Sequence, residues 1–354
     1  TWRVASAVRV LQLAVALLLY LPLVSALPTI QERATVCNGR AELCNRSYGN
    51  VTFLTSHDSF ASSPNPLALA RTQQIDLNAQ MKLGVRGLQA QSHMKDGRLF
   101  DGGSVLDYLK KVKAFMDANP NEVFTFIFTN PENLSPKSVW DPIFQQAGLV
   151  GLAYVPPHLP MKASEWPTLG QMIDSVDYGA NTAEVPYILP EFDHVWEPPF
   201  SSTDPSFPCR VDRISGPLSS QDHMFMINHN LNAKVSPWKS KRLAEPEPVA
   251  KPGWFDSITS AIGNGVDHVK DTIDQGVDHV KDTIDQVGDN VNTDALPTIL
   301  VPDFLSAPRT NGMASILADS NGCSAFSGGK AANFVLLDFV DIGQGMKTVN
   351  LMNG

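Results

Sequence analysis

The stretch Val51-Thr-Phe-Leu-Thr-Ser-His-Asp-Ser59 decides how the rest of the chain is interpreted. Its first half is apolar and rich in β-branched residues, which is typical of a buried strand. It ends in His57 and Asp58, with hydroxyl residues on both sides. An imidazole changes charge near neutral pH, so a histidine at the mouth of a strand is suited to proton transfer. A capped strand end with a solvated surface histidine gives the same dipeptide, and the surrounding sequence has to decide between the two.

The surrounding sequence alternates between strand and helix patterns. Strands are predicted at 85–94, 122–130, 223–230 and 333–341, and helices at 70–82, 107–119, 138–148 and 166–176, with a proline-rich ordered loop at 185–208. The strand Glu122–Asn130 is apolar enough to be buried on both faces. The last strand carries Asp338 and Asp341 at or near its far end. This alternation indicates right-handed crossovers and a parallel sheet, the signature of an α/β fold.

Residues 234–298 have a different composition and are predicted to be an insertion. A charged linker, Pro237–Pro252, precedes a perfect duplication in which Gly265–Gln275 is repeated as Gly276–Gln286. Apolar residues from Phe255 to Val291 recur at helical spacing, which predicts a long amphipathic helix. This helix either docks on a partner or a lipid surface, or packs on its own domain or on a second copy of the chain. Its polar face is mainly Asp, which argues against a membrane surface.

Charge and the first residues indicate where the protein works. The formal net charge of −9 leaves no basic stripe for the phosphates of a nucleic acid, which excludes that partner class. Residues 1–26 are predicted to be a signal peptide, and a membrane anchor is the alternative, although the apolar run is short for one. The features of a signal peptide are the basic residues Arg3 and Arg9, the apolar run Val10–Leu21 and the cleavage pattern Val24–Ala26. We therefore expect a secreted protein with a mature chain of residues 27–354.

The cysteines are even in number, as expected in an oxidising compartment. Cys37 and Cys44 are close enough in sequence to close a small loop, which leaves Cys209 and Cys323 as a long-range disulfide. A metal site is the alternative, but no Cys-x-x-Cys spacing occurs. Three acceptor sequons predict a glycoprotein, at Asn45, Asn50 and Asn133.

Several blocks of the chain resemble a known family. The run Cys37-Asn-Gly-Arg-Ala-Glu-Leu-Cys44, followed by Arg46–Ser59, is similar to the start of the secreted fungal PLC-like phosphodiesterases, relatives of the bacterial phosphatidylinositol-specific phospholipase C X domain. Further similar blocks follow in the same order, at 84–93, 106–124, 185–209 and 333–343. The resemblance covers most of residues 37–232 and 300–354. It implies a distorted TIM (β/α) barrel, whose sites lie at the carboxyl ends of the strands, and a role in lipid metabolism.

The resemblance also implies a chemistry. A phosphodiester, in a lipid or a soluble molecule, is cleaved with the substrate's own neighbouring hydroxyl as the nucleophile. His57 would be the general base, oriented by Asp338, and Asp58 would orient a second histidine that acts as the acid. In relatives the second histidine follows the second strand in a segment that is absent here, and His93 is the candidate to replace it.

Phosphate contacts and metal use follow from the same comparison. Arg86 and Lys95 are the nearby cations, and two interpretations stay open for each: it meets the phosphate of a substrate, or it is simply solvated. Gln89 and Gln91 stand where calcium-dependent relatives carry carboxylates, and we assign them to substrate binding. Neutral amides are poor sole ligands for a hard dication, so no metal or other cofactor is expected.

The chain also departs from the family near Ser175–Tyr178, where an apolar strand of the relatives is absent. The barrel is therefore expected to lack one strand. The missing second histidine favours an alternative function: a catalytically impaired barrel that binds a phosphate or an inositol. A third hypothesis makes the helix Phe255–Val291 the working part of an interaction protein.

Overall fold

The computed structural model describes residues 34–65, 68–95, 97–100, 103–174, 185–235 and 299–354. These residues belong to one compact unit, Ala34–Gly354. The predicted signal peptide and the predicted helix Phe255–Val291 lie outside the described residues.

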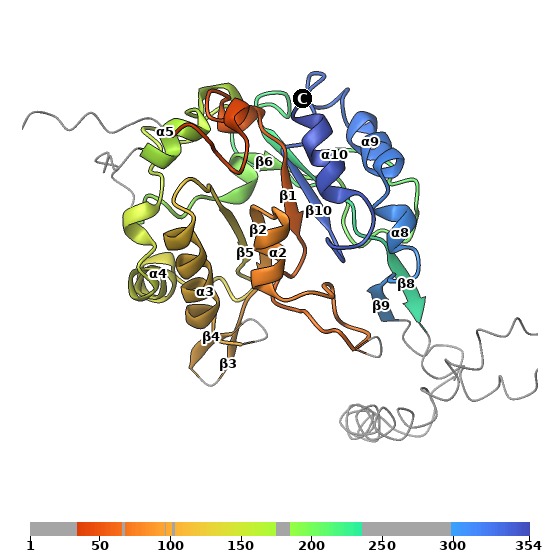
Figure 1. Ribbon diagram of the computed structural model, residues 1–354, viewed down its shortest axis with the longest axis horizontal. Coiled ribbons are helices and arrows are strands. Elements are labelled where there is room, and N and C mark those ends of the chain that lie inside the picture. Colours follow the sequence, from red (N-terminus) through yellow and green to blue (C-terminus); the bar gives the residue numbers. More distant parts are fainter. Residues whose placement is uncertain (1–33, 66–67, 96, 101–102, 175–184, 236–298) are drawn as a thin grey trace, which may run out of the picture. The chain divides into compact units, whose positions relative to one another are not determined.

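The core of this unit is a sheet of six parallel strands, in the order β5-β2-β1-β10-β7-β6 (Figure 1). The strands are β1 (Phe53–Ser56), β2 (Gly87–Gln91), β5 (Thr125–Thr129), β6 (Val195–Trp196), β7 (Met224–Asn228) and β10 (Phe334–Leu337). β1 lies between β2 and β10, so the first and last strands of the sheet are neighbours. The stretch around Val51–Ser59 is therefore a central strand, as its apolar pattern predicts.

Alternation along the strands separates two hydrophobic clusters. On β1 and β10, Phe53, Phe334 and Leu336 pack in one cluster with Tyr48 and Trp166. The intervening residues pack in the other cluster, against the helices α2 (Leu77–Leu83), α3 (Val105–Ala118), α4 (Asp141–Ala147) and α10 (Gly345–Met352). Each side chain thus faces the side opposite to its neighbours, as strand geometry requires. His57 and Asp338 lie one residue beyond β1 and β10. By the same alternation they lie on the face of the sheet that carries Phe53, Phe334 and Leu336.

Short elements complete the described residues. The remaining helices are η1 (Ala41–Leu43), η2 (Tyr48–Asn50), η3 (Pro136–Trp140), η4 (Val150–Leu152), η5 (Ala163–Glu165), α5 (Leu169–Asp174), η6 (Glu191–Asp193), α8 (Ala307–Thr310) and α9 (Met313–Gly322). Two antiparallel pairs lie outside the main sheet: β3 (His93–Lys95) with β4 (Arg98–Phe100), and β8 (Asn232–Val235) with β9 (Ile299–Pro302).

The sheet is a curled half-barrel in the described part of the chain. Its strands run in chain order from β1 through β2 to β5 and from β6 through β7 to β10, and β10 returns to β1. The described residues between β5 and β6 form helices, turns and one isolated bridge, and add no strand to this sheet. The expectation that residues 122–130 are buried on both faces is wrong, because β5 is the last strand on its side and only Ile127 is fully buried there.

One predicted helix begins later than expected. α2 starts at Leu77 rather than near residue 70, because the Asp76 carboxylate accepts a hydrogen bond from the Ala79 amide and caps the helix. The preceding residues form a loop instead, and this loop buries Arg71, Thr72 and Gln73. Gln73 and Thr72 reach the site described below.

Two disulfides confirm the predicted pairing. Cys37 bonds to Cys44, and Cys209 bonds to Cys323 across 114 positions of sequence. The second bond joins the chain ahead of β7 to the end of α9.

Candidate functional site

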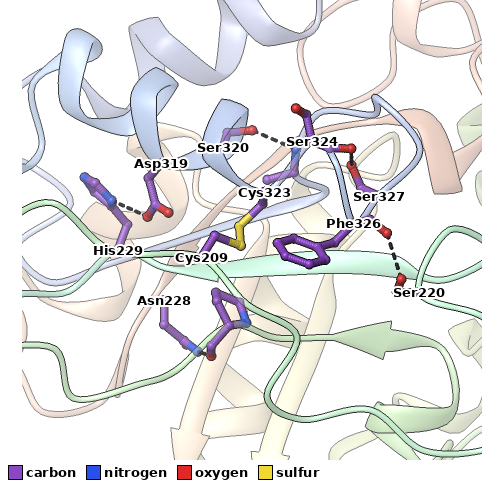
Figure 2. The surroundings of a disulfide bond; sticks show 12 residues. Cys209, Ser220, Asn228, His229, Asp319, Ser320, Cys323, Ser324, Phe326 and Ser327 are labelled. Atoms are coloured by element: carbon purple, nitrogen blue, oxygen red, sulfur yellow. Dashed lines mark hydrogen bonds and ion pairs between the residues drawn. A yellow bond between two sulfur atoms is a disulfide. The ribbon is translucent and has the colours of Figure 1, made fainter.

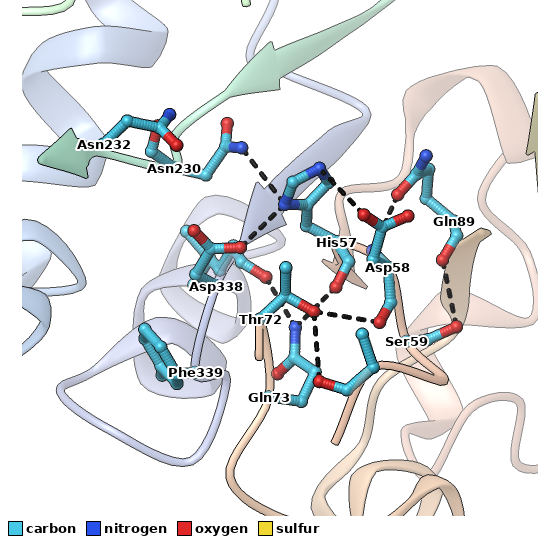
Figure 3. A network of polar contacts seen from close by, with 12 residues as sticks. His57, Asp58, Ser59, Thr72, Gln73, Gln89, Asn230, Asn232, Asp338 and Phe339 are labelled. Atoms are coloured by element: carbon cyan, nitrogen blue, oxygen red, sulfur yellow. Dashed lines mark hydrogen bonds and ion pairs between the residues drawn. The ribbon is translucent and has the colours of Figure 1, made fainter. Parts of the chain in front are cut away.

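His57 and Asp338 meet at the carboxyl edge of the sheet. The register pairs Ser56 of β1 with Leu337 of β10, so the next residues of the two strands lie side by side. The His57 amide donates to the Leu337 carbonyl at 3.0 Å, which fixes the backbone. The His57 Nδ1 atom then lies 2.7 Å from Asp338 Oδ1 (Figure 3). Two residues that are 281 positions apart are thus joined directly by strand pairing.

Two further side chains surround the His57 ring. The Asn230 amide nitrogen lies 3.2 Å from Nδ1, on the same side of the ring as Asp338 (Figure 3). On the other side, Asp58 Oδ2 lies 3.8 Å from Nε2. The side chain of His57 is 25% exposed and that of Asp338 only 7%. With Nδ1 held by Asp338, Nε2 is the ring nitrogen that remains to exchange a proton.

The surrounding charges raise the pKa of His57. Burial alone lowers this pKa, but Asp338, Asp58 and Glu197 favour the protonated ring and together outweigh burial. Burial has the opposite effect on the carboxylate: it raises the pKa of Asp338, although the charge of His57 opposes that change. The pair therefore holds a proton more tightly than an exposed histidine and carboxylate would.

Amide side chains hold the backbone of the pair. Gln73 Nε2 donates to the carbonyls of His57 and Leu337, at 2.8 and 3.1 Å, and its Oε1 accepts from the Val340 amide. Asn311 Nδ2 donates to the Asp338 carbonyl at 2.7 Å. Both ends of the His57–Asp338 contact are thus fixed by buried hydrogen bonds.

Asp58 has a backbone conformation that needs support. Its φ is +37°, in the left-handed region that non-glycine residues seldom adopt. The Gln89 Oε1 atom accepts from the Asp58 amide at 2.7 Å, and Thr72 Oγ1 donates to the Asp58 carbonyl at 2.9 Å. Strain of this kind persists where neighbours hold it, and it is common in functional sites.

A carboxylate lies at the end of β6, two strands from Asp338. Glu197 is buried, its carboxylate pairs with Arg213, and Asn228 of β7 donates to it at 3.2 Å. Burial raises the pKa of the neighbouring Glu191 to about 9, and the charge of Glu197 adds to this effect. The charge of Glu197 also favours the protonated form of His57 and so raises the pKa of its ring.

Three buried polar atoms of the site have no hydrogen-bond partner among the described residues. They are Asp58 Oδ1, Asp338 Oδ2 and Asn230 Oδ1. Buried acceptors of this kind are costly in a finished structure, because each has lost its water. They are suited to accept hydrogen bonds from the hydroxyl groups of a ligand.

The structure brings together only part of the predicted site. Gln89 belongs to the network around His57, whereas Gln91 is exposed at the end of β2. His93 and Lys95 lie on the exposed β3–β4 pair, where His93 Nδ1 is 2.8 Å from Glu132 Oε1. Among the described residues, no second histidine forms a hydrogen bond or ion pair with His57, Asp58 or Asp338.

Arg86 requires a correction. It precedes β2, at the opposite end of the sheet, and is buried. Its guanidinium pairs with Glu122 at 2.6 Å, donates to two backbone carbonyls and stacks on the rings of Phe115 and Phe124. These structural partners occupy the guanidinium, so Arg86 does not belong to the substrate-binding set.

Sequence reasoning missed Gln73, Asn230 and Glu197. Asn230 ends a predicted strand in the polar run Asn228-His-Asn230, and a polar run at a strand's carboxyl end was the available signal. Gln73 lies in a loop, and Glu197 follows a two-residue strand inside a segment predicted to be a loop, so no strand pattern marked either residue.

The described residues contain neither a metal-binding cluster nor a membrane-spanning helix. No group of three or more His, Cys, Asp and Glu side chains could hold a metal ion there. Within the same residues, no helix has the length and apolarity needed to cross a membrane.

The parallel half-barrel and the histidine–carboxylate pair at its carboxyl edge define an α/β protein with a candidate proton-transfer site. The sequence profile of the PI-PLC X 1 family matches residues 43–272 and 274–353. The chain therefore belongs to the PI-PLC X domain family.

Two relatives from Arthroderma benhamiae are similar to the chain. An uncharacterized secreted protein is 38% identical over 218 residues, which are 56% of this chain and 49% of that protein. A PI-PLC X domain-containing protein 1 is 37% identical over 238 residues, 62% of this chain and 76% of that protein. The match thus spans about half of the first relative and about three quarters of the second.

More distant similarities are weaker. A PI-PLC X domain-containing protein of Arabidopsis thaliana is 26% identical over 149 residues, 36% of this chain and 34% of that protein. A solved structure from work on the membrane binding of the S. aureus phosphatidylinositol-specific phospholipase C has a TM-score of 0.39 at 12% identity. The match covers 87% of this chain and 94% of the chain in the solved structure.

Proposed function

We propose that the protein is a phosphoric diester hydrolase of the PLC-like type, in which His57 is the general base. The observation that carries this proposal is the 2.7 Å contact between His57 Nδ1 and Asp338 Oδ1, with Nε2 left for proton exchange. A carboxylate that holds Nδ1 orients the ring and stabilises the imidazolium formed when Nε2 takes up a proton. Membership of the PI-PLC X domain family supports the reaction class.

In the proposed reaction, His57 Nε2 accepts the proton of a substrate hydroxyl next to the phosphodiester. The hydroxyl oxygen forms a bond to phosphorus, while the bond from phosphorus to the leaving oxygen breaks. The leaving oxygen takes up a proton from a general acid, for which His93 is the candidate histidine. The products are a cyclic diester and a free alcohol, and water can then open the ring by the reverse proton transfers.

The substrate is proposed to carry several hydroxyl groups, as a phosphoinositide does. The buried acceptors Asp58 Oδ1, Asp338 Oδ2 and Asn230 Oδ1 support a hydroxyl-rich ligand. Gln91, the last residue of β2, and Lys95, in the following strand β3, remain proposed contacts of the headgroup. Turnover of such a substrate links the protein to lipid metabolism.

Secretion, glycosylation and a barrel lacking one strand belong to the same proposal. Two disulfides and a relative named as a secreted protein support an extracellular location. The order of the six strands supports a barrel that is open between β5 and β6.

The test compares four forms of the purified chain on phosphatidylinositol vesicles and on a soluble phosphodiester. His57→Ala should abolish turnover, because it removes the base. His158→Ala is the matched control, since this histidine is exposed and its ion-pair partner is Glu165 rather than a residue of the His57 network. His93→Ala decides whether His93 supplies the acid. Turnover that survives in His57→Ala would refute the proposal.

A second candidate function is a binding module without catalysis. The observation that favours it is the ion pair of His93 with Glu132, on an exposed hairpin, because it leaves His57 without a second histidine in the described network. Calorimetry with inositol phosphates on the wild-type chain tests this candidate. Heat of binding without turnover would support it, and no heat at millimolar ligand would exclude it.

A further inference from the structure

His229 lies between two residues of the site and is completely buried. It follows Asn228, which donates to Glu197, and precedes Asn230, which approaches His57. Its Nδ1 atom is 2.7 Å from Asp319 Oδ2, a carboxylate of α9 (Figure 2). Its Nε2 atom is 2.8 Å from the Thr310 carbonyl and 3.2 Å from Ser315 Oγ. The mechanism proposed above does not use this histidine.

The partners of His229 fix where its protons lie. A backbone carbonyl can only accept, so Nε2 carries a hydrogen and donates it to Thr310. A second proton lies between Nδ1 and the Asp319 carboxylate. Burial raises the pKa of Asp319, while His229 opposes the change. The ring therefore cannot turn or leave without abandoning a buried acceptor on each side.

The segment that holds His229 also holds Asp338. Thr310 accepts from the His229 ring, and the next residue, Asn311, donates to the carbonyls of Asp338 and Phe339 at 2.7 and 3.1 Å. Both residues that contact His57 Nδ1 are thus tied to one short stretch at the junction of α8 and α9. Asn230 is tied through its neighbour His229, and Asp338 is tied through its own backbone.

We propose that the buried His229–Asp319 pair is a positioning device that holds Asn230 and Asp338 against the His57 ring. His229 and Asp319 are positioning residues, because they act through Asn230 and Asn311 and do not face the ring of His57. The proposal rests on the proposed function only for its effect on turnover. Its effect on His57 itself is measurable without any substrate.

The experiment uses His223 as a matched control. His223 is also fully buried and precedes β7 as His229 follows it, and its two ring nitrogens face the carbonyls of Ser219 and Phe192 at 2.8 and 3.2 Å. His229→Gln and His223→Gln therefore remove comparable buried rings from opposite ends of one strand. Asp319→Asn is the second variant. It keeps the shape of the carboxylate side chain and so provides a test even if His229→Gln fails to fold.

The main readout is the pKa of His57, measured by NMR titration of the full chain. The His57 signal is assigned as the one that disappears in His57→Ala. We expect His229→Gln and Asp319→Asn to lower this pKa towards the ordinary value of 6.5, because the ring loses its fixed contact with Asp338. His223→Gln should leave the pKa unchanged. Asp319→Glu should restore part of the shift, because it returns a carboxylate to His229.

Turnover is the second readout. It should fall roughly tenfold to a hundredfold in His229→Gln and stay near wild type in His223→Gln. An unchanged His57 pKa in both His229→Gln and Asp319→Asn, or an equal shift in His223→Gln, would overturn the positioning proposal. If the wild type turns over no phosphodiester, the proposed function fails, while the NMR result still decides the role of His229.

Discussion

At the scale of single residues, the site depends on one carboxylate that is buried beside one histidine. Asp338 is almost inaccessible to solvent, and its Oδ1 atom contacts His57, while its Oδ2 atom has no hydrogen-bond partner in the described part of the chain. A charge in such a place acts through a low dielectric, so its influence on the ring is large. The raised pKa of His57 is the measurable sign of that influence.

Asp338→Asn should shift the pH profile of turnover. A general base works only when it is unprotonated, so turnover rises with pH through the pKa of His57. Asp338 raises that pKa above 6.5, and its removal should move the rising limb to lower pH. The plateau should fall by roughly 10²–10⁴, because the neutral amide no longer stabilises the imidazolium. Steady-state rates measured from acidic to mildly alkaline pH report both effects.

Asp341→Asn is the control for this change. Asp341 lies three residues further along the chain and is half-buried, and it makes no hydrogen bond to His57. The limb should keep its wild-type position in this variant. A limb that stays in place in Asp338→Asn as well would contradict the role given to Asp338.

The same raised pKa predicts how stability depends on pH. A histidine with a raised pKa in the folded state adds stability at low pH, and this contribution is lost as pH rises through the folded pKa. His57→Gln should remove that dependence. Urea unfolding of both proteins at about pH 5.5 and about pH 8.5 provides the comparison, on either side of the titration. An equal pH dependence in the two proteins would contradict the prediction.

At the scale of elements, two contacts determine how the strands reach the site. β1 and β2 approach closely at Gly87, where a Cβ atom would lie 2.2 Å from Thr55 Oγ1 and 2.8 Å from Thr55 Cβ. Beyond the sheet, β8 and β9 pair in antiparallel register, with Val235 opposite Ile299. The first contact sets the distance between β1 and β2, the strands that lead to His57 and Gln89. The second contact brings together the residues that flank the segment 236–298.

Gly87→Ala should destabilise the fold. The added methyl group has no room, because Thr55 is fully buried and cannot move away. Overpacking of this kind costs about 1–3 kcal/mol of unfolding free energy. Gly103→Ala, where no described residue other than the chain neighbours has an atom within 4 Å of the place the new methyl group would take, should change stability by less than about 0.5 kcal/mol. Thermal and urea unfolding of the two variants give the comparison, and equal losses would refute the steric explanation.

Replacing residues 236–298 with a two-residue Asn-Gly turn should leave the half-barrel intact. Val235 and Ile299 are already paired, so a type I′ turn can join them without a change of register. Shortening a loop changes the closure free energy by only about 0.6 kcal/mol per halving of length. Turnover should match that of the full chain, and the shortened protein should still unfold in one cooperative transition.

The same deletion tests the partner proposed for Phe255–Val291. If that segment binds a lipid surface or a second copy of the chain, the shortened protein should lose liposome binding or decrease in oligomer mass. Unchanged values of both would argue against an interaction role for this segment.

At the scale of the whole molecule, long-range contacts hold the site. Cys209–Cys323 joins positions 114 apart, whereas Cys37–Cys44 spans only 7. The long disulfide ends directly after α9, the helix that carries Asp319. It therefore restrains both the unfolded chain and the support of the site.

Removing the long disulfide should cost more stability than removing the short one. Cys209→Ala with Cys323→Ala should lower the free energy of unfolding by about 4–5 kcal/mol, because a long loop is released. The Cys37→Ala and Cys44→Ala pair should lose about half as much. Urea unfolding of both double variants checks the order, and a larger loss in the short-loop pair would reverse the interpretation.

The sequence allowed prediction of what local patterns and strand ends encode. The apolar run before His57, the apolar run before Asp338 and both disulfides follow from patterning and spacing. The start of α2 was also encoded, by Asp76, although the helical pattern suggested an earlier start. Arg86 was misjudged because a cation near a site and a cation behind it look alike in sequence. Only the fold shows that Glu122 and two aromatic rings surround it.

The support of the site could not be predicted in the same way. Gln73, Asn311 and the His229–Asp319 pair contact the site through hydrogen bonds between segments far apart in the chain. Polar residues in loops have no periodicity, so nothing in one sequence indicates which of them converge.

The pairing of β1 with β10 has a consequence for biosynthesis. The ribosome makes His57 long before Asp338, and the 281 positions between them take roughly 15 to 60 s to translate. His57 therefore leaves the exit tunnel of the ribosome before Asp338, its carboxylate partner, has been synthesised. Activity of the proposed kind can begin only after the C-terminal strand has emerged and paired with β1.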